Sequence, residues 1–238
     1  MTHVAYWGDH DGTNFGDILN KPLLDHYGVN YTHTRNHTEG NLFVIGSVAR
    51  LAEPGSIVVG SGVFRRDEAY DPRVTFRCVR GPITREHVLK GGGDCPKIYG
   101  DPALLLPRFV PQQEKKYKLG CTVHYLHRRY NIIKQLKEKG VHYIDIFNDD
   151  PLEVAKEISS CERMMSTSLH GIIASHAYGI PAAHFHFGGR KIHGDGVKFE
   201  DHYAAMNLDH SCDRISKLEF RVGTLPFLDL IENEIKKL

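Results

Sequence analysis

The chain has 238 residues, 41% of them hydrophobic and 25% charged, a composition that is ordinary for a soluble globular protein. The length allows one large domain or two small ones. The formal net charge is only +1 with the histidines neutral, so no basic excess favours a nucleic-acid partner.

The five cysteines are widely spaced and contain no CxxC pair, which argues against a disulfide framework and against a structural zinc site. The 16 histidines contain no HExxH pair, and we expect no metal. The first residues become charged too early for a signal peptide, and no apolar run approaches the length of a membrane span. We expect a cytoplasmic protein without a transmembrane segment.

Short apolar runs without polar alternation predict parallel strands in a sheet that is covered on both faces. Asp17 is expected to cap the first helix, Gly28 to follow its end, and Pro82 to begin the second helix. The first half of the chain is expected to hold strands at 3–7, 29–32, 42–47, 57–62 and 74–79 and helices at 17–27 and 80–90.

The polar residues 107–116, which include Pro107 and Pro111, form the candidate linker to a second series of strands and helices. The two series predict an α/β fold in which two Rossmann-like domains, 1–108 and 109–238, face one cleft. The second domain is expected to hold strands at 117–124, 141–147, 163–165 and 182–187, a helix opened by Asp150, a helix ended by Gly179, and helices at 128–139, 198–206, 215–220 and 225–238.

Three hydroxyl residues, Ser166, Thr167 and Ser168, separate an expected strand from a helix whose first turn holds His170. The amide hydrogens at such a helix start lack intrahelical partners and attract anions. A histidine beside them can pass a proton to or from a bound ligand. A capped helix with a buried histidine that bonds a backbone carbonyl accounts for the same residues, and the sequence weighs the two readings equally.

Polar residues and glycines also follow three expected strands. Asn14 and Asp17 lie at a strand-to-helix turn, where they either bind hydroxyl groups, with Asp17 as a base, or form an Asx turn and a helix cap. Ser47, Ser61 and Gly62 follow two buried strands. Ligands of open α/β sheets bind at the carboxyl ends of strands, and glycine allows a close approach to the backbone. Packing alone also explains glycines at these places.

Arginines follow two of the expected strands, 57–62 and 74–79. Arg80 directly follows a strand, and Arg85 lies about one helical turn beyond it. Arginine binds phosphate or carboxylate through two parallel hydrogen bonds. The alternative is a solvated basic face, and for Arg65 and Arg66 we prefer that alternative.

Lys198 and Asp201 are three residues apart on an expected helix and share one face, where they either orient a ligand or pair with each other. His184 and His186 point the same way on a strand. We judge both histidines structural, because no cysteine or carboxylate partner is evident. The glycine-rich loop 188–196 carries further charged residues.

Seven short stretches follow one another in order along nearly the whole chain: Asn14-Phe15-Gly16-Asp17 with Asn20, Ile45-Gly46-Ser47, Gly60-Ser61-Gly62, Arg80-Gly81-Pro82 with Thr84 and Arg85, Gly100-Asp101-Pro102-Ala103, Ser168-Leu169-His170-Gly171, and Lys198 with Asp201. Together they resemble the polysaccharide pyruvyl transferase family. The pattern is most similar to the branch that adds pyruvate ketals to bacterial exopolysaccharides.

The resemblance implies a fold like that of two-domain GT-B glycosyltransferases, with the C-terminal helix. It implies phosphoenolpyruvate as the donor, a sugar or oligosaccharide with two free hydroxyls as the acceptor, whether free or lipid-linked, and no cofactor or metal. On this basis His170 is the predicted general acid, Arg80 the predicted anion clamp and Asp17 the predicted base. The predicted substrate-binding residues are Asn14, Gly16, Ser47, Ser61, Gly62, Arg85, Ser168, Lys198 and Asp201.

Two other functions are compatible with the same residues. A GT-B glycosyltransferase that uses a nucleotide sugar would place the diphosphate at the start of the histidine helix. A non-catalytic sugar-binding module on the same scaffold would bind oligosaccharide but not phosphoenolpyruvate.

Overall fold

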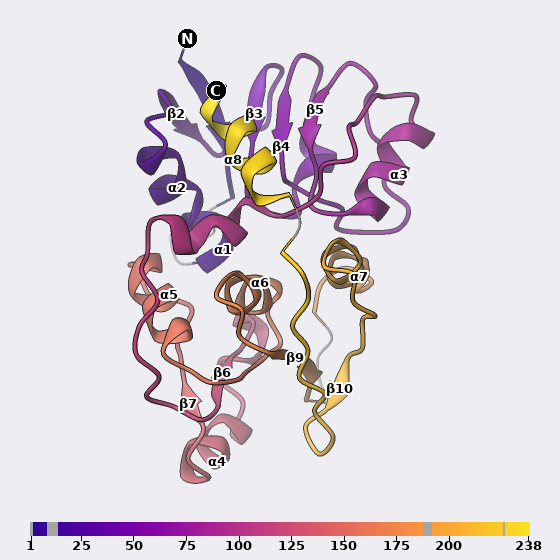
Figure 1. The fold of residues 1–238 in the computed structure, drawn as a ribbon. Coiled ribbons are helices and arrows are strands. Elements are labelled where there is room, and N and C mark those ends of the chain that lie inside the picture. Colours follow the sequence, from indigo (N-terminus) through magenta and orange to yellow (C-terminus); the bar gives the residue numbers. More distant parts are fainter. Residues whose placement is uncertain (1, 9–13, 188–191, 226) are drawn as a thin grey trace.

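The computed structural model describes residues 2–8, 14–187, 192–225 and 227–238. These residues form an α/β fold with two five-stranded sheets, and the strand pairs of each sheet are parallel. The first sheet comes from the first half of the chain and the second sheet from the second half (Figure 1). The two strand-and-helix series expected from the sequence are therefore confirmed as two sheets.

The first sheet has the strand order β2-β1-β3-β4-β5. Its third and fourth strands are shorter than the apolar runs, because the backbone leaves the sheet where Gly46 and Gly60 adopt positive φ angles of 129° and 88°. Glycine takes these angles without the steric cost that a Cβ atom imposes. The strands are β1 (His3–Tyr6), β2 (Tyr31–Thr34), β3 (Asn41–Phe43), β4 (Ile57–Val59) and β5 (Thr75–Cys78).

The second sheet has the strand order β10-β9-β8-β6-β7. Its three central strands are buried, as the apolar runs predict. The strands are β6 (Gly120–Thr122), β7 (His142–Tyr143), β8 (Met164–Ser166), β9 (Ala182–His186) and β10 (Asp213–Arg214).

Helices join the strands of both sheets. Asp150 caps its helix as expected, because its carboxylate accepts hydrogen bonds from the Leu152 and Glu153 amides. The α-helices are α1 (Phe15–Ile18), α2 (Asn20–His26), α3 (Pro82–Lys90), α4 (Ile132–Glu138), α5 (Pro151–Ser159), α6 (Leu169–Ala177), α7 (Val197–Ala205) and α8 (Leu228–Lys236), and the 3₁₀ helices are η2 (Ala49–Leu51), η3 (Pro102–Arg108) and η4 (Tyr125–His127).

Two helix predictions are wrong. The helix expected at 17–27 is divided at Leu19, and Asn14 rather than Asp17 occupies its N-cap. Pro22 has no amide hydrogen to donate to the carbonyl four residues earlier, so the helix is interrupted there. Residues 215–220 form no helix. The Asp213 carboxylate accepts a hydrogen bond from the Glu219 amide and holds this segment as a turn after β10.

The C-terminal helix α8 returns to the first half of the molecule. It packs against η3, β4 and β5, with Ile231 and Ile235 buried, and Figure 1 shows it beside the first sheet. Arg108 and Asp229 form an ion pair at the surface, with 2.7 Å between Nη2 and Oδ1. The predicted second domain therefore contributes a helix to the first sheet. The domain boundary at 108/109 stays a prediction.

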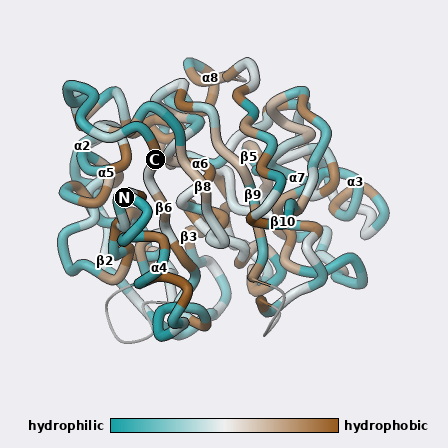
Figure 2. The backbone as a smooth tube through the Cα atoms, turned by 90° about the horizontal axis from the view of Figure 1, so that it is seen from below, coloured by the Kyte–Doolittle hydropathy of each residue, from teal (hydrophilic) through white to brown (hydrophobic). Residues whose placement is uncertain are grey.

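One hydrophobic core joins the two halves. Leu104 to Leu106 on η3 and Ile172 and Ile173 on α6 are fully buried in the same cluster, which also contains residues of both sheets. Figure 2 shows hydrophilic segments mostly in the loops around the rim. The packing of η3 on α6 fixes one half against the other. Among the described residues, no helix has the length and apolar character needed to cross a bilayer.

Four buried or partly buried histidines form two hydrogen-bonded pairs in the second half. His176 Nδ1 lies 3.0 Å from His202 Nε2, and His184 Nδ1 lies 2.8 Å from His210 Nε2. Burial lowers the pKa of His176 to about 4 and the pKa values of His184 and His202 well below their usual range. These rings are neutral in the folded protein at neutral pH.

We expect the free energy of unfolding to fall as the pH drops from about 6.5 towards 4. In that window the unfolded chain binds protons at these positions and the folded chain does not, so acid favours unfolding. His176 alone accounts for about 3 kcal/mol. Urea unfolding at a series of pH values measures the effect, and a His176→Gln variant should show a weaker dependence. Equal stability at pH 7 and pH 5 would contradict this expectation.

Candidate active site

A cavity of about 400 Å³ lies between the two halves of the molecule. It is lined where strands of both sheets end: Gly8 follows β1, Ser47 follows β3, His124 follows β6 and Ser168 follows β8. This is the place where open parallel sheets bind ligands. Of the predicted site residues, Asn14, Asp17, Ser47, Ser168, His170 and Lys198 line this cavity, and Gly16, Ser61, Gly62, Arg80, Arg85 and Asp201 do not.

His170 lies in the first turn of α6 and lines the cavity with a side chain that is 12% exposed. Its ring packs against the backbone of Gly16, so closely that a Cβ atom at that residue would lie 2.0 Å from Nδ1. Nε2 is buried without a hydrogen-bond partner and lies 3.6 Å from Oδ2 of Asp101. The alternative of a core histidine bonded to a carbonyl is therefore not what the described residues show.

The start of α6 is open toward the cavity. Ser168 is the N-cap residue, as predicted, but its hydroxyl makes no capping hydrogen bond. The Ser166 hydroxyl instead accepts a hydrogen bond from the Ser168 amide and donates one to the Ser168 carbonyl. The first-turn amides of this nine-residue helix thus have no side-chain cap, which suits an anionic ligand.

Asn14 and Asp17 line the part of the cavity wall that the first half contributes. Asn14 is the N-cap of α1, yet its side chain makes no capping hydrogen bond. Asp17 lies close enough to Tyr6 for its charge to raise the pKa of that phenol, after the larger effect of burial. The cap alternative for Asn14 is thus not supported, and both polar side chains face the cavity.

Arg80 does not reach the cavity. Its side chain is fully buried, and it donates hydrogen bonds to the Ser47 hydroxyl, at 2.7 Å, and to the Val63 carbonyl. The guanidinium packs on Gly62, where a Cβ atom would lie 2.5 Å from Cζ. Ser47 thus separates Arg80 from the cavity, so the expectation that Arg80 itself clamps the ligand needs correction.

Three other predicted residues also lie outside the cavity wall. Ser61 is buried, and its hydroxyl donates a hydrogen bond to the Gly46 carbonyl. Arg85 points elsewhere, because its Nε donates to the Cys95 carbonyl. Asp201 is fully buried at the junction of α7 with α3. The sequence predicts these three residues near the site, but in the folded protein their side chains bond to other groups and do not line the cavity.

Asp201 and Lys198 leave α7 toward different partners. The Asp201 carboxylate accepts hydrogen bonds from the amide and the hydroxyl of Thr84, and its Oδ2 lies 3.3 Å from Nε of Arg80 in a buried ion pair. Lys198 Nζ lies 5.2 Å from the centre of the Phe64 ring. Burial, followed by the charge of Arg80, lowers the Lys198 pKa to about 8. Lys198 is thus the member of the pair that lines the cavity.

A family model for polysaccharide pyruvyl transferase matches residues 14–185. The chain belongs to the polysaccharide pyruvyl transferase family. It is 30% identical over 206 residues to the uncharacterized protein L143 of Acanthamoeba polyphaga mimivirus. The alignment covers 82% of this chain and 72% of L143. It is 29% identical over 188 residues to the succinoglycan biosynthesis protein ExoV of Rhizobium meliloti (strain 1021). That alignment covers 74% of this chain but only 57% of ExoV.

Sequence reasoning missed several residues that line the cavity of this pyruvyl transferase family member. Arg65 lines the cavity, although the sequence favoured a solvated basic face for it. Arg66 pairs with Glu200 at the surface. Arg50 lines it from η2, three residues after Ser47. A count of arginines shortly after Gly-Ser turns would have found both Arg50 and Arg65.

Two histidines and one aspartate were also missed. His124 and His193 line the cavity from the second half, and burial, with the charge of Lys198 next, lowers the His124 pKa to about 3. Asp101 stands in the family stretch Gly100-Asp101-Pro102-Ala103 but carried no predicted role. Residues 9–13 of the first loop and residues 188–191, which include Arg190 and Lys191, lie outside the described residues.

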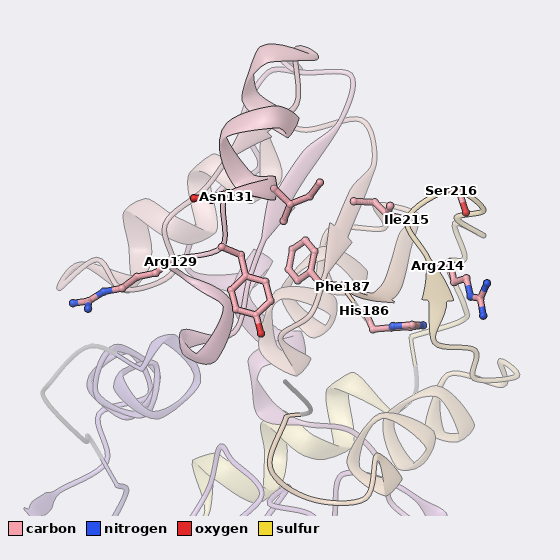
Figure 3. A pocket seen from close by; sticks show the side chains of 9 residues that line it. Arg129, Asn131, His186, Phe187, Arg214, Ile215 and Ser216 are labelled. Carbon is pink, nitrogen blue, oxygen red and sulfur yellow. The ribbon is translucent and has the colours of Figure 1, made fainter. Parts of the chain in front are cut away.

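A second cavity, of about 670 Å³, lies at the end of β9 and β10. His186, Phe187 and Arg214 line it together with Arg129. Figure 3 shows Arg129 and Arg214 on opposite sides of this cavity, with their guanidinium groups directed away from each other. They cannot grip one anion between them, so this cavity is a poorer candidate for a phosphate or carboxylate than the cavity that holds His170.

Proposed function

We propose that this family member transfers the pyruvyl group of phosphoenolpyruvate to two hydroxyls of a sugar and so forms a pyruvate ketal. One observation carries the proposal: a single cavity joins the proton donor His170 from one half with Asn14 and Asp17 from the other. Acid and base groups contributed by different halves to one cavity suit a reaction that protonates one substrate and deprotonates the other. The similarity to ExoV, a succinoglycan biosynthesis protein, supports a polysaccharide acceptor.

The donor carries a phosphate and a carboxylate, so its site must be cationic and rich in amide donors. Arg50, Arg65 and Lys198 line the cavity, and the uncapped start of α6 opens into it beside Ser168. Guanidinium groups and helix-start amides are the usual partners of such anions. We assign the phosphate and carboxylate of the donor to this end of the cavity.

The reaction follows from these positions. His170 gives a proton to the vinyl carbon of the donor, which makes the adjacent carbon an oxocarbenium-like electrophile. A sugar hydroxyl attacks that carbon and loses its proton to Asp17, while Asn14 orients the sugar. The C–O bond to phosphate then breaks, and the phosphate leaves with the proton that Asp17 took up. The second hydroxyl closes the ring, and its proton restores His170. These are acid–base steps, so the proposed reaction needs no metal or cofactor.

In this scheme Arg80 acts without touching the substrate, because it is buried behind Ser47. It holds the Ser47 hydroxyl in place and adds positive charge beneath the donor site. Gly62 gives the guanidinium the room to lie there, and Gly16 does the same for the His170 ring. Ser61 fixes the turn before Gly62 through the Gly46 carbonyl. Arg85 has no part in the scheme, because its side chain is bound elsewhere.

Two wider features belong to the same proposal. Two parallel sheets that face a shared cavity are the arrangement expected for a GT-B-like enzyme. All five cysteines are free thiols, which favours a reducing compartment and hence the cytoplasm.

The deciding experiment incubates the protein with phosphoenolpyruvate and a panel of free and lipid-linked glycans. We expect one glycan to gain the mass of a single pyruvyl group and inorganic phosphate to appear in equal amount. Transfer of a hexose from UDP- or GDP-sugars would instead favour a glycosyltransferase. Stabilisation in a thermal shift assay by oligosaccharide, but not by phosphoenolpyruvate, would favour a binding module.

A further inference from the structure

Asp101 lies directly behind the His170 ring. It is the N-cap of η3, the 3₁₀ helix that packs on α6. Its side chain is fully buried, and Oδ1 accepts a hydrogen bond from the Ala103 amide at 3.0 Å. Oδ2 points to Nε2 of His170 at 3.6 Å, and both atoms are buried without a hydrogen-bond partner. The cap thus explains one oxygen of Asp101 and leaves the other unexplained.

A buried carboxylate oxygen without a partner destabilises a fold by the full cost of its lost hydration. Among the described residues, the imidazole of His170 is placed to remove this cost, since a shift of about half an ångström brings Nε2 within hydrogen-bond distance. Catalytic hydrogen bonds are often long without substrate and shorten in the complex. The pair is therefore built for a hydrogen bond that forms with a loaded cavity.

We propose that Asp101 is a positioning residue. Its carboxylate accepts a hydrogen bond from Nε2–H of His170, fixes the ring and stabilises the protonated ring. This inference rests on the proposed function of His170 as the proton donor. With Nε2 bound to Asp101, Nδ1 is the nitrogen left to exchange a proton with the donor, on the side of Gly16 and Asp17. The Gly16 backbone limits movement of the ring, so Asp101 and Gly16 together define where that nitrogen lies.

Other charged and titratable groups surround the ring, but none takes the place of Asp101. Asp17 approaches from α1 on the cavity side, and Lys198 lines the same cavity from α7. His202, also from α7, is neutral, because burial and the charges of neighbouring groups lower its pKa. Asp101 is therefore the buried carboxylate that lies against the inner nitrogen.

One substitution separates this role from the capping role. Asp101→Asn keeps an oxygen that can accept the Ala103 amide hydrogen, since Asn is a good N-cap. In Asp101→Asn the amide group then faces Nε2 and donates to it, so the neutral ring must carry its proton on Nδ1. We expect kcat to fall about 100-fold or more with a smaller change in KM. The pH profile of kcat should also change, because a carboxylate no longer faces the imidazole.

The direct measurement is ¹⁵N NMR of His170 with phosphoenolpyruvate bound and no acceptor present, compared with the substrate-free protein, which reports the protonated ring nitrogen in each state. We expect Nε2–H in the native protein and Nδ1–H in Asp101→Asn. Asp150→Asn makes the same change at the N-cap of α5, where the carboxylate bonds backbone amides, and should leave the His170 spectrum and kcat unchanged.

The outcomes distinguish this inference from the function on which it rests. An unchanged ring tautomer in Asp101→Asn, or an unchanged kcat and pH profile, overturns the role of Asp101. If the tautomer changes but the native protein transfers no pyruvyl group, the pairing stands and the proposed function fails.

Discussion

A His170→Gln variant is expected to transfer pyruvyl groups about 10²- to 10⁴-fold more slowly than the native protein. Glutamine keeps a polar side chain in the first turn of α6 but cannot deliver a proton at neutral pH. Because the ring lines the cavity and forms no hydrogen bond with Asp101, its buried neighbour at 3.6 Å, the fold should tolerate the change. Initial rates at saturating phosphoenolpyruvate, together with a thermal melt, measure both effects.

The matched control is His186→Gln, which makes the same chemical change at the exposed end of β9. His186 lines the second cavity (Figure 3), where we assign no chemistry. Its rate should equal that of the native protein. Full activity of His170→Gln would remove the imidazole from the mechanism, whereas a loss in both variants would point to a general effect on folding.

The parts of the site that the sequence predicts well are those set by local order. A polar residue just after a strand in a parallel sheet must lie at the carboxyl edge, whatever the rest of the chain does. Ser47 and Ser168 follow this rule and line the cavity, and Asn14 and Asp17 line it from the start of the helix that comes after β1. The same order explains why the start of α6 lies in the site.

The parts that the sequence could not predict depend on contacts between the halves. Arg65 and Arg80 both follow strands of the first sheet, and the local sequence does not show that Arg80 turns inward. Arg80 turns inward because Asp201, a residue of the other half, meets it in the interior. Asp101 meets His170 only because η3 packs on α6. Such side-chain directions are set by the assembled fold and not by the neighbouring sequence.

The buried ion pair also changes what is expected of Arg80. From the sequence, Arg80→Ala is predicted to lose activity and stay folded. The structure adds a second effect, because Asp201 would then keep a buried charge without its counter-charge. Removing one partner of such a pair typically costs about 3–5 kcal/mol. Loss of activity in Arg80→Ala alone therefore says little about catalysis until its stability is known.

Asp201→Ala is expected to lower the free energy of unfolding by about 3–5 kcal/mol. The substitution leaves the Arg80 guanidinium charged and buried, and it removes the acceptor of the Thr84 amide and hydroxyl. Chemical denaturation at pH 7 measures the loss. The neighbouring residue Glu200 gives the control, because its ion pair with Arg66 joins the same two halves but is partly exposed.

Glu200→Ala should cost no more than about 1 kcal/mol, since water and salt screen an exposed pair. The contrast between two adjacent carboxylates on α7 separates the effect of burial from that of charge. If Asp201→Ala lowers the free energy of unfolding as little as Glu200→Ala does, the Arg80 guanidinium must reach water when Asp201 is replaced.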